Sequence, residues 1–260
     1  MRMKISVMLM KNKEYWEKRM DNALKLSEKQ IQKPLKKLYR QAFRNIREEL
    51  FTIWLDMQSG GSISQSDLYQ RNRMANLQAL LSKELQRLGV KQIELLQQGL
   101  YNVGVQGFTD MSSFLGLAGT FSFLDEQVAK EIISQNYKGA TFSERIWNDM
   151  DKLHQQIEDG VVKSASQGKD VRKVSQMIQE RMNVCFSSAK RITVTETGRV
   201  FNESCRRKAS DNGYKTYSVL IEPDACEDCI KDLRGKHFNI NESVLPRHPN
   251  CKCCMIIDLD

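Results

Sequence analysis

Two short stretches near the C-terminus decide how the end of the chain folds: Cys226-Glu227-Asp228-Cys229 and His248-Pro249-Asn250-Cys251-Lys252-Cys253. The first stretch places two thiols on one tight turn. The second brings an imidazole and two further thiols back after the 18 residues 230–247. Cysteine and histidine at such spacings are typical ligands of a tetrahedral Zn²⁺ ion. Residues 214–260 contain few large apolar side chains and can bury little apolar surface. We therefore expect a small α+β zinc-knuckle domain that is stabilised by its bound ion.

Five candidate ligands compete for four coordination positions: Cys226, Cys229, His248, Cys251 and Cys253. The favoured set omits Cys253, which is the substitute for Cys251 because alternate residues of an extended segment point the same way. Cys254 then points away from the ion, and His237 is expected to be an ordinary surface histidine. A disulfide or redox pair is the alternative, but seven cysteines is an odd number, and the doublet is expected in a polar loop and not at the start of a helix after a strand.

The composition of the whole chain favours a mostly α-helical protein. The 260 residues are 40% hydrophobic with only four prolines, and no apolar run is long enough to cross a membrane. We expect an elongated helical N-terminal and central region followed by the small knuckle domain. The expected division is a basic helical arm (1–58), a helical middle region (59–140) and a C-terminal domain (141–260) whose metal-binding part is 214–260.

Apolar periodicity and turn residues give the expected elements. Pro34 fits the first turn of a helix that runs to about residue 57, and Gly60-Gly61 ends it. Gly89 is expected to stop the next helix. The remaining expected helices span 66–88, 91–115, 125–135, 142–166, 170–184 and 187–210. Strands are expected at 214–221 and 255–259, paired with each other and connected by the zinc loop.

The positive charge is concentrated at the N-terminus. Of a net charge of +8, residues 1–49 contribute 14 Lys and Arg against 6 Asp and Glu. One face of the helix after Pro34 carries basic side chains at spacings of three and four: Lys33, Lys36, Lys37, Arg40, Arg44 and Arg47. This face predicts contact with a polyanion, either nucleic acid or an acidic protein surface. A solvated helix face is the alternative.

A second run of charges lies in the helix expected at 187–210, where Glu196, Arg199, Glu203 and Arg207 follow one another at three and four residues. This spacing predicts a salt-bridged stripe on the protein surface. A buried partner for Glu196 would instead favour a functional role.

Together these motifs resemble the Mu F type phage head morphogenesis family, the minor head (minor capsid) proteins of tailed bacteriophages. The resemblance rests on residues 189–196 with Asn202, on Asp224-x-Cys226-x2-Cys229, on Gly235-Lys236-His237-Phe238 and on the terminal His-Pro-Asn-Cys-x-Cys. The sequence departs from the family pattern at Lys252 and Val194, where the family usually has arginine.

The resemblance implies a structural virion component, not an enzyme, located in the head interior near the portal and assembled in the host cytoplasm. Head assembly, DNA packaging or DNA ejection would be its task. The portal protein, the major capsid protein or a scaffolding protein would be its partners, with no small-molecule substrate. Non-specific double-stranded DNA is a further expected partner of the basic helix. The alternatives are a DNA-binding packaging factor and a zinc-containing nuclease, for which the chain offers only His154, His237 and His248.

Overall fold

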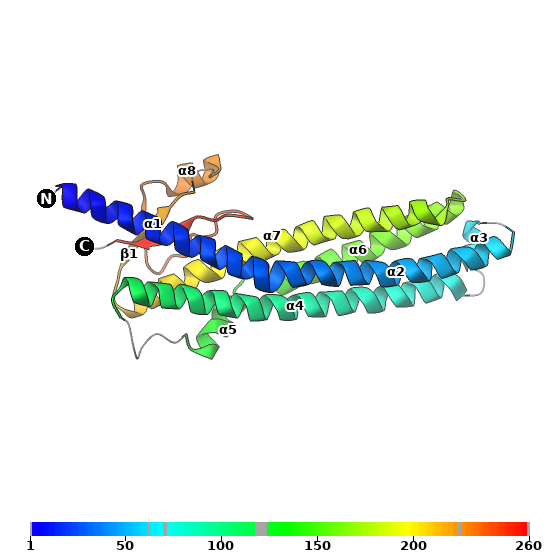
Figure 1. The fold of residues 1–260 in the computed structure, drawn as a ribbon, viewed down its shortest axis with the longest axis horizontal. Coiled ribbons are helices and arrows are strands. Elements are labelled where there is room, and N and C mark those ends of the chain that lie inside the picture. Colours follow the sequence, from blue (N-terminus) through cyan, green and yellow to red (C-terminus); the bar gives the residue numbers. More distant parts are fainter. Residues whose placement is uncertain (1, 62, 70–71, 118–123, 223–224, 259–260) are drawn as a thin grey trace. The chain divides into compact units, whose positions relative to one another are not determined.

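The computed structural model describes residues 2–61, 63–69, 72–117, 124–222 and 225–258, which are mostly helical with a small antiparallel sheet (Figure 1). This confirms the mostly α-helical class. The helices are α1 (Arg2–Ser27), the π-helical η1 (Glu28–Gln32), α2 (Lys33–Ser59), α3 (Gln65–Tyr69), α4 (Arg73–Phe114), α5 (Glu126–Ser134), α6 (Phe142–Ser166), α7 (Val171–Asp211) and α8 (Glu227–Leu233). The strands are β1 (Thr216–Leu220), β2 (His237–Asn239) and β3 (Cys254–Ile257). No helix within the described residues is both long and apolar enough to cross a membrane.

The chain forms two compact units, each assembled from separate segments. Unit 1 consists of Met1–Gln32, Leu96–Thr141 and Arg191–Asp260, and unit 2 consists of Lys33–Leu95 and Phe142–Lys190. The helices α4 and α7 each contribute to both units. The division expected from the sequence, at residues 58 and 140, stays a prediction.

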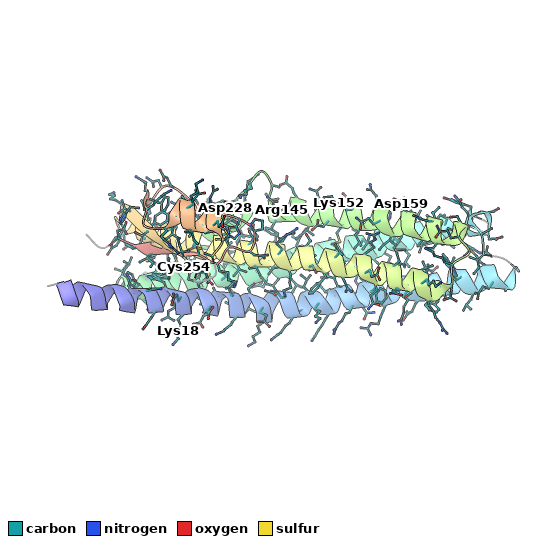
Figure 2. All side chains as sticks on the ribbon, turned by 90° about the horizontal axis from the view of Figure 1, so that it is seen from above. Lys18, Arg145, Lys152, Asp159, Asp228 and Cys254 are labelled. Atoms are coloured by element: carbon teal, nitrogen blue, oxygen red, sulfur yellow. The ribbon has the colours of Figure 1, made fainter. Side chains whose placement is uncertain are left out.

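Unit 2 is built on amphipathic helices. The apolar face predicted for α2 is buried, including Leu35, Ile46 and Leu50, and the Trp54 indole N–H donates to the Lys169 carbonyl at 3.0 Å. The helix α6 likewise buries one row of apolar side chains and exposes charged ones, Lys152 and Asp159 among them (Figure 2). One buried stripe per helix is therefore enough to hold this unit together.

Two predicted helix ends are wrong. Gly89 does not stop a helix but lies inside α4, where a Cβ atom would come within 2.7 Å of Trp147 Cζ3. This glycine serves close packing and not termination. The helices expected at 170–184 and 187–210 are one helix, α7, since Met182, Cys185 and Ala189 continue its buried row without a break.

The prediction that Pro34 lies in the first turn of a helix is confirmed at the entry to α2. The chain passes from α1 through η1 directly into α2, with Pro34 in the first turn of α2. Proline has no amide hydrogen to donate to the preceding turn, and a π-helical turn is a common way for a helix to accommodate such a gap.

The sheet has the strand order β2-β1-β3, with both pairs antiparallel. The predicted pairing of the first and last strands is confirmed, although β3 ends at Ile257, and Leu259 lies outside the described residues. The expected two-stranded arrangement is wrong, because the connecting loop adds β2. Gly235 adopts a φ of +69° after α8, and the chain then returns beside β1, where the Tyr217 and Phe238 ring centroids are 5.6 Å apart.

Candidate metal centre

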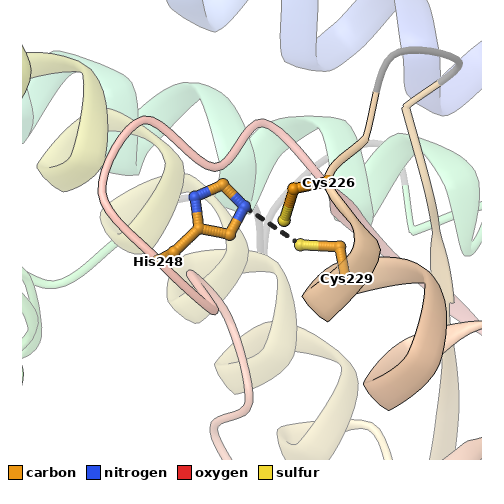
Figure 3. Close-up of side chains that lie close together, drawn as sticks. All are labelled: Cys226, Cys229 and His248. Carbon is orange, nitrogen blue, oxygen red and sulfur yellow. Dashed lines mark hydrogen bonds between the residues drawn. The ribbon is translucent and has the colours of Figure 1, made fainter.

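The structure brings together all five side chains that the sequence indicates as metal ligands. They form two overlapping groups, one of Cys226, Cys229 and His248 and one of Cys229, Cys251 and Cys253, with the ligand atoms of each group within 4.8 Å of one another. Cys229 belongs to both. Figure 3 shows the His248 ring directed at the two sulfur atoms of the doublet. The polar loop expected for the doublet is wrong, because Cys226 is the N-cap of α8 and Cys229 lies in its first turn.

The separations of the donor atoms fit a metal site better than a disulfide. Cys229 Sγ lies 3.9 Å from Cys251 Sγ and 3.1 Å from His248 Nε2. Two sulfurs on one tetrahedral Zn²⁺ lie roughly 3.8 Å apart, given Zn–S bonds of about 2.3 Å, whereas a disulfide requires about 2.05 Å. All seven cysteines are free. The cluster therefore has the donor set and spacing that a thiophilic metal ion requires.

The His248 ring is oriented by the backbone carbonyl of the next residue. Its Nδ1 lies 2.8 Å from the Pro249 carbonyl oxygen. Because a carbonyl oxygen can only accept, Nδ1 carries the hydrogen, and the Nε2 lone pair faces the Cys229 sulfur. A backbone carbonyl on the second ring nitrogen is the usual support of a ligating histidine.

The pKa values of the clustered thiols indicate that a nearby cation is needed for more than one of them to ionise. Burial raises the pKa of Cys229 to about 12. A hydrogen bond from Cys253 lowers the pKa of Cys251 to about 5. The hydrogen bond to Cys251, together with burial, raises the pKa of Cys253. One thiolate is thus supported by its neighbours, while two or three in this space need a positive ion.

His237 and Cys254, which were not expected to bind the ion, belong to neither group of donor atoms. His237 is exposed, and its Nδ1 lies 2.8 Å from Asp258 Oδ2. Cys254 is buried at the start of β3.

One face of α7 holds the cysteine-bearing segment in place. The Thr195 hydroxyl accepts a hydrogen bond from the Asn250 amide at 2.9 Å. The Asn202 side chain donates to the Cys253 carbonyl at 3.1 Å and accepts from the Met255 amide at 2.9 Å. Between them, a Cβ atom on Gly198 would lie 3.0 Å from the Cys251 carbonyl oxygen. Residues 195, 198 and 202 have the spacing of one helix face, but nothing in the sequence indicates which segment this face contacts.

The charged stripe predicted for the surface of α7 is buried, and that prediction is wrong for its first three members. Glu196, Arg199 and Glu203 are 2%, 4% and 5% exposed. Arg199 donates to Glu196 at 2.8 Å and to the Ile132 and Ile133 carbonyls at the end of α5. Since both sides of α7 are covered in unit 1, its charges have protein partners in place of water. Glu196 thus has the buried partner that would favour a functional role, and the same arginine ties α7 to the end of α5.

The six basic side chains of α2 are all exposed and lie opposite its buried face: Lys33, Lys36, Lys37, Arg40, Arg44 and Arg47. Lys36 and Arg40 border a hollow of about 190 Å³ that Phe43 also lines. The six side chains therefore lie on one basic face of α2. Contact of this face with a polyanion stays a prediction.

Fold and site together define a helical protein with a cysteine-rich α+β module built onto a long helix. Residues 155–256 match the family described as phage Mu protein F like protein. The match extends from α6 to β3 and contains all five candidate ligands, so the resemblance to phage head morphogenesis proteins is confirmed there. No curated protein and no solved structure matches the chain.

Proposed function

We propose that the protein is a structural minor head protein of a tailed bacteriophage. It acts in head assembly, DNA packaging or ejection from the head interior near the portal, after assembly in the host cytoplasm. The match of residues 155–256 to the phage Mu protein F like family supports a head morphogenesis role. The portal protein, the major capsid protein or a scaffolding protein are its partners.

The observation that carries a structural role is the surplus of donors in the cysteine cluster. Five side chains, in two groups of three donors that share Cys229, are available for the four positions of a tetrahedral Zn²⁺. Catalytic zinc sites keep one position open for water or substrate, whereas structural sites are closed by protein ligands. Zn²⁺ bound here would neutralise the thiolates and cross-link α8 to the segment that precedes β3.

Metal analysis and hydrogen exchange test this role. We expect one tightly bound zinc per chain in the natural protein. Replacing Cys229 with serine should remove it and lower amide protection in residues 214–222 and 225–258, while α2 and α6 stay protected, because the ion stabilises only this segment.

Cys185→Ser is the control, since Cys185 lies in unit 2 and contributes to neither donor group. Unchanged protection in Cys229→Ser, or protein purified without a bound metal, would refute the structural ion. DNA cleavage by the zinc-loaded protein that disappears in His248→Ala would refute the non-catalytic role.

For the basic face of α2 we propose non-specific binding of double-stranded DNA. Six exposed cations on one helix face can follow a phosphate backbone without reading bases. Affinity should fall steeply with salt and should not depend on sequence. Replacing Lys36, Arg40 and Arg44 with glutamine should reduce the slope of log K against log salt by roughly 0.9 per lost phosphate contact.

The matched control replaces three exposed basic residues of unit 2 outside this face, Lys152, Lys163 and Arg172, with glutamine. Fluorescence anisotropy with a duplex oligonucleotide at several salt concentrations gives both slopes. Equal slopes for the two triple variants would exclude the α2 face as the DNA contact.

A further inference from the structure

The hollow of about 190 Å³ in unit 2 lies beside the basic face of α2, where α2 and α7 meet. The helix α2 contributes Lys36, Tyr39, Arg40 and Phe43 to its lining, and α7 contributes apolar and amide side chains. The volume is below the roughly 300–1,000 Å³ of pockets for whole small-molecule ligands. The hollow therefore suits a single group of about the size of an aromatic ring system.

The buried part of the lining is apolar and held in place. Tyr39 and Met182 are both buried. The Tyr39 hydroxyl donates to Gln92 Oε1 at 3.0 Å, which ties the ring to α4. The Phe186 ring packs against the Tyr39 ring in an edge-to-face arrangement, with the centroids 5.4 Å apart. A ligand would therefore meet a preformed apolar surface.

Two phenylalanine rings of the lining remain partly accessible. Phe43 on α2 and Phe186 on α7 are each only partly buried. The Arg47 guanidinium lies over the Phe43 ring, with Cζ 5.8 Å from the ring centroid, so this ring already lies among cations. Aromatic rings next to basic side chains are the surface on which unpaired bases stack in proteins that bind single-stranded nucleic acid.

The two basic side chains of the lining are available to an anionic ligand. Lys36 and Arg40 are exposed, and neither forms an ion pair or a hydrogen bond with another described residue. The described residues that line the hollow include no carboxylate. The positive charge can therefore bind phosphate. On the α7 side, the exposed amides of Gln179 and Asn183 supply donors and acceptors for the polar edge of a base.

This lining suits a nucleic acid strand better than a peptide. Both walls of the hollow are α-helices, whose backbone N–H and C=O groups bond within the helix. The hollow consequently offers an extended peptide none of the backbone hydrogen bonds by which sheet edges bind such segments. What it offers are cations and aromatic rings, which match the phosphate and the base of a nucleotide. Because the bases of a duplex are stacked inside it, only an unpaired base can enter.

We propose that this hollow binds an unpaired base of a single-stranded nucleic acid, with the backbone phosphates at Lys36 and Arg40 and the base against Phe43 and Phe186. The inference rests on the proposed binding of DNA by the basic face of α2, and it adds a preference for strands that expose their bases. It does not require the metal centre of unit 1.

The test compares two single strands of equal charge on the full chain. One is a fluorescein-labelled dodecamer of deoxythymidine, and the other is a labelled dodecamer of the same backbone without bases. Fluorescence anisotropy near physiological salt should show that the deoxythymidine strand binds about fivefold or more tightly, which is the gain expected from stacking one base.

The double variant Phe43→Leu/Phe186→Leu should lower this ratio to less than about twofold, because leucine keeps the apolar contact but removes the stacking ring. Its affinity for the strand without bases should not change, since Lys36 and Arg40 remain, and this result also shows that the variant is folded. If the double variant does not fold, the single variants Phe43→Leu and Phe186→Leu give the same comparison.

Phe51→Leu is the matched control, since Phe51 is another partly buried phenylalanine of α2 that does not line the hollow. It should keep the ratio of the natural protein. Equal affinity of the natural protein for the two strands, or an unchanged ratio in Phe43→Leu/Phe186→Leu, would overturn the base site and leave salt-dependent duplex binding intact.

Two further outcomes would also overturn the inference. If neither the single strands nor a duplex bound, the proposed DNA contact of α2 would be lost together with the base site. An acidic octapeptide of alternating glutamate and phenylalanine that bound more tightly than the deoxythymidine strand, and lost this affinity in Phe43→Leu/Phe186→Leu, would assign the hollow to a protein partner.

Discussion

The two parts of α7 have the same secondary structure but opposite burial patterns. In unit 2, residues 171–190 bury a single row at spacings of three and four: Val171, Val174, Ile178, Met182, Cys185 and Ala189. In unit 1, residues 195–205 are buried on every side, and many of them are polar: Thr195, Glu196, Thr197, Arg199, Asn202, Glu203 and Ser204. The first part is held by an apolar stripe, and the second positions its neighbours through directed polar contacts.

The difference has an energetic consequence. A buried polar group is costly unless it is hydrogen-bonded. In the second part such bonds are made to other segments, as where the Thr197 hydroxyl lies 2.7 Å from the Ser27 hydroxyl. Exposed polar residues of the first part can hydrogen-bond to water and therefore do not need a protein partner. Loss of one polar partner should therefore cost far more free energy of unfolding in residues 191–211 than in residues 171–190.

Arg199→Ala should give the largest effect. It leaves the buried Glu196 side chain without its guanidinium, and it removes the donors to the Ile132 and Ile133 carbonyls at the end of α5. Breaking a buried ion pair by removing one partner costs about 3–5 kcal/mol. Urea unfolding measures the loss. Arg181→Ala, at an exposed position of the first part, should change the stability by less than about 0.5 kcal/mol.

A double variant separates the cost of the unpaired charge from the cost of lost packing. Glu196→Leu combined with Arg199→Met should be less destabilised than Arg199→Ala alone, since no charge is left without a partner. If the double variant were the less stable of the two, the contacts of Arg199 with α5, and not the ion pair, would dominate.

The features of the fold and of the metal centre that can be predicted from the sequence are those that depend on local periodicity or on the chemistry of a residue type. The buried face of α2 follows from apolar spacing alone, and the thiol and imidazole donors follow from ligand spacing. Gly89 was expected to end a helix, but it allows close packing against Trp147. This role could not be predicted because Trp147 lies 58 positions further along the chain (147 − 89). Glu196 and Arg199 have the same spacing whether they face water or protein, so only the covering segments could decide their burial. The short strand β2 carries no periodic signal over its three residues.

Asn202→Leu should give the second largest effect, because it removes the contacts that hold the strand-bearing end of the cysteine segment. Leucine keeps the approximate volume but leaves the Met255 amide and the Cys253 carbonyl without Asn202. Buried groups that lose a partner cost about 1–3 kcal/mol each, so we expect about 2–4 kcal/mol. Asn183→Leu, at an exposed position of the first part, is the matched control and should be nearly neutral.

Hydrogen exchange locates the effect of Asn202→Leu. The Met255 amide should exchange faster in this variant than in the natural protein, while amides of α6 should not change. Uniform acceleration in both units would mean that Asn202 stabilises the whole chain and does not act on this segment in particular.

Thr195→Val should give the smallest effect of the three. Valine has nearly the same shape but removes the acceptor of the Asn250 amide and the bond from Thr195 to the Arg191 carbonyl. Asn250 is exposed and has a φ of 63°, so water can replace the lost acceptor and the turn conformation remains available. We expect a loss of about 1 kcal/mol and faster exchange at the Asn250 amide. Ser187→Ala, which removes a hydroxyl that donates to the Asn183 carbonyl within the first part of α7, is the control. If Thr195→Val and Ser187→Ala were equally stable, Asn202 and the packing at Gly198 would suffice to hold the cysteine-bearing segment. Polar positioning of this segment by α7 would then depend on Asn202 and not on Thr195.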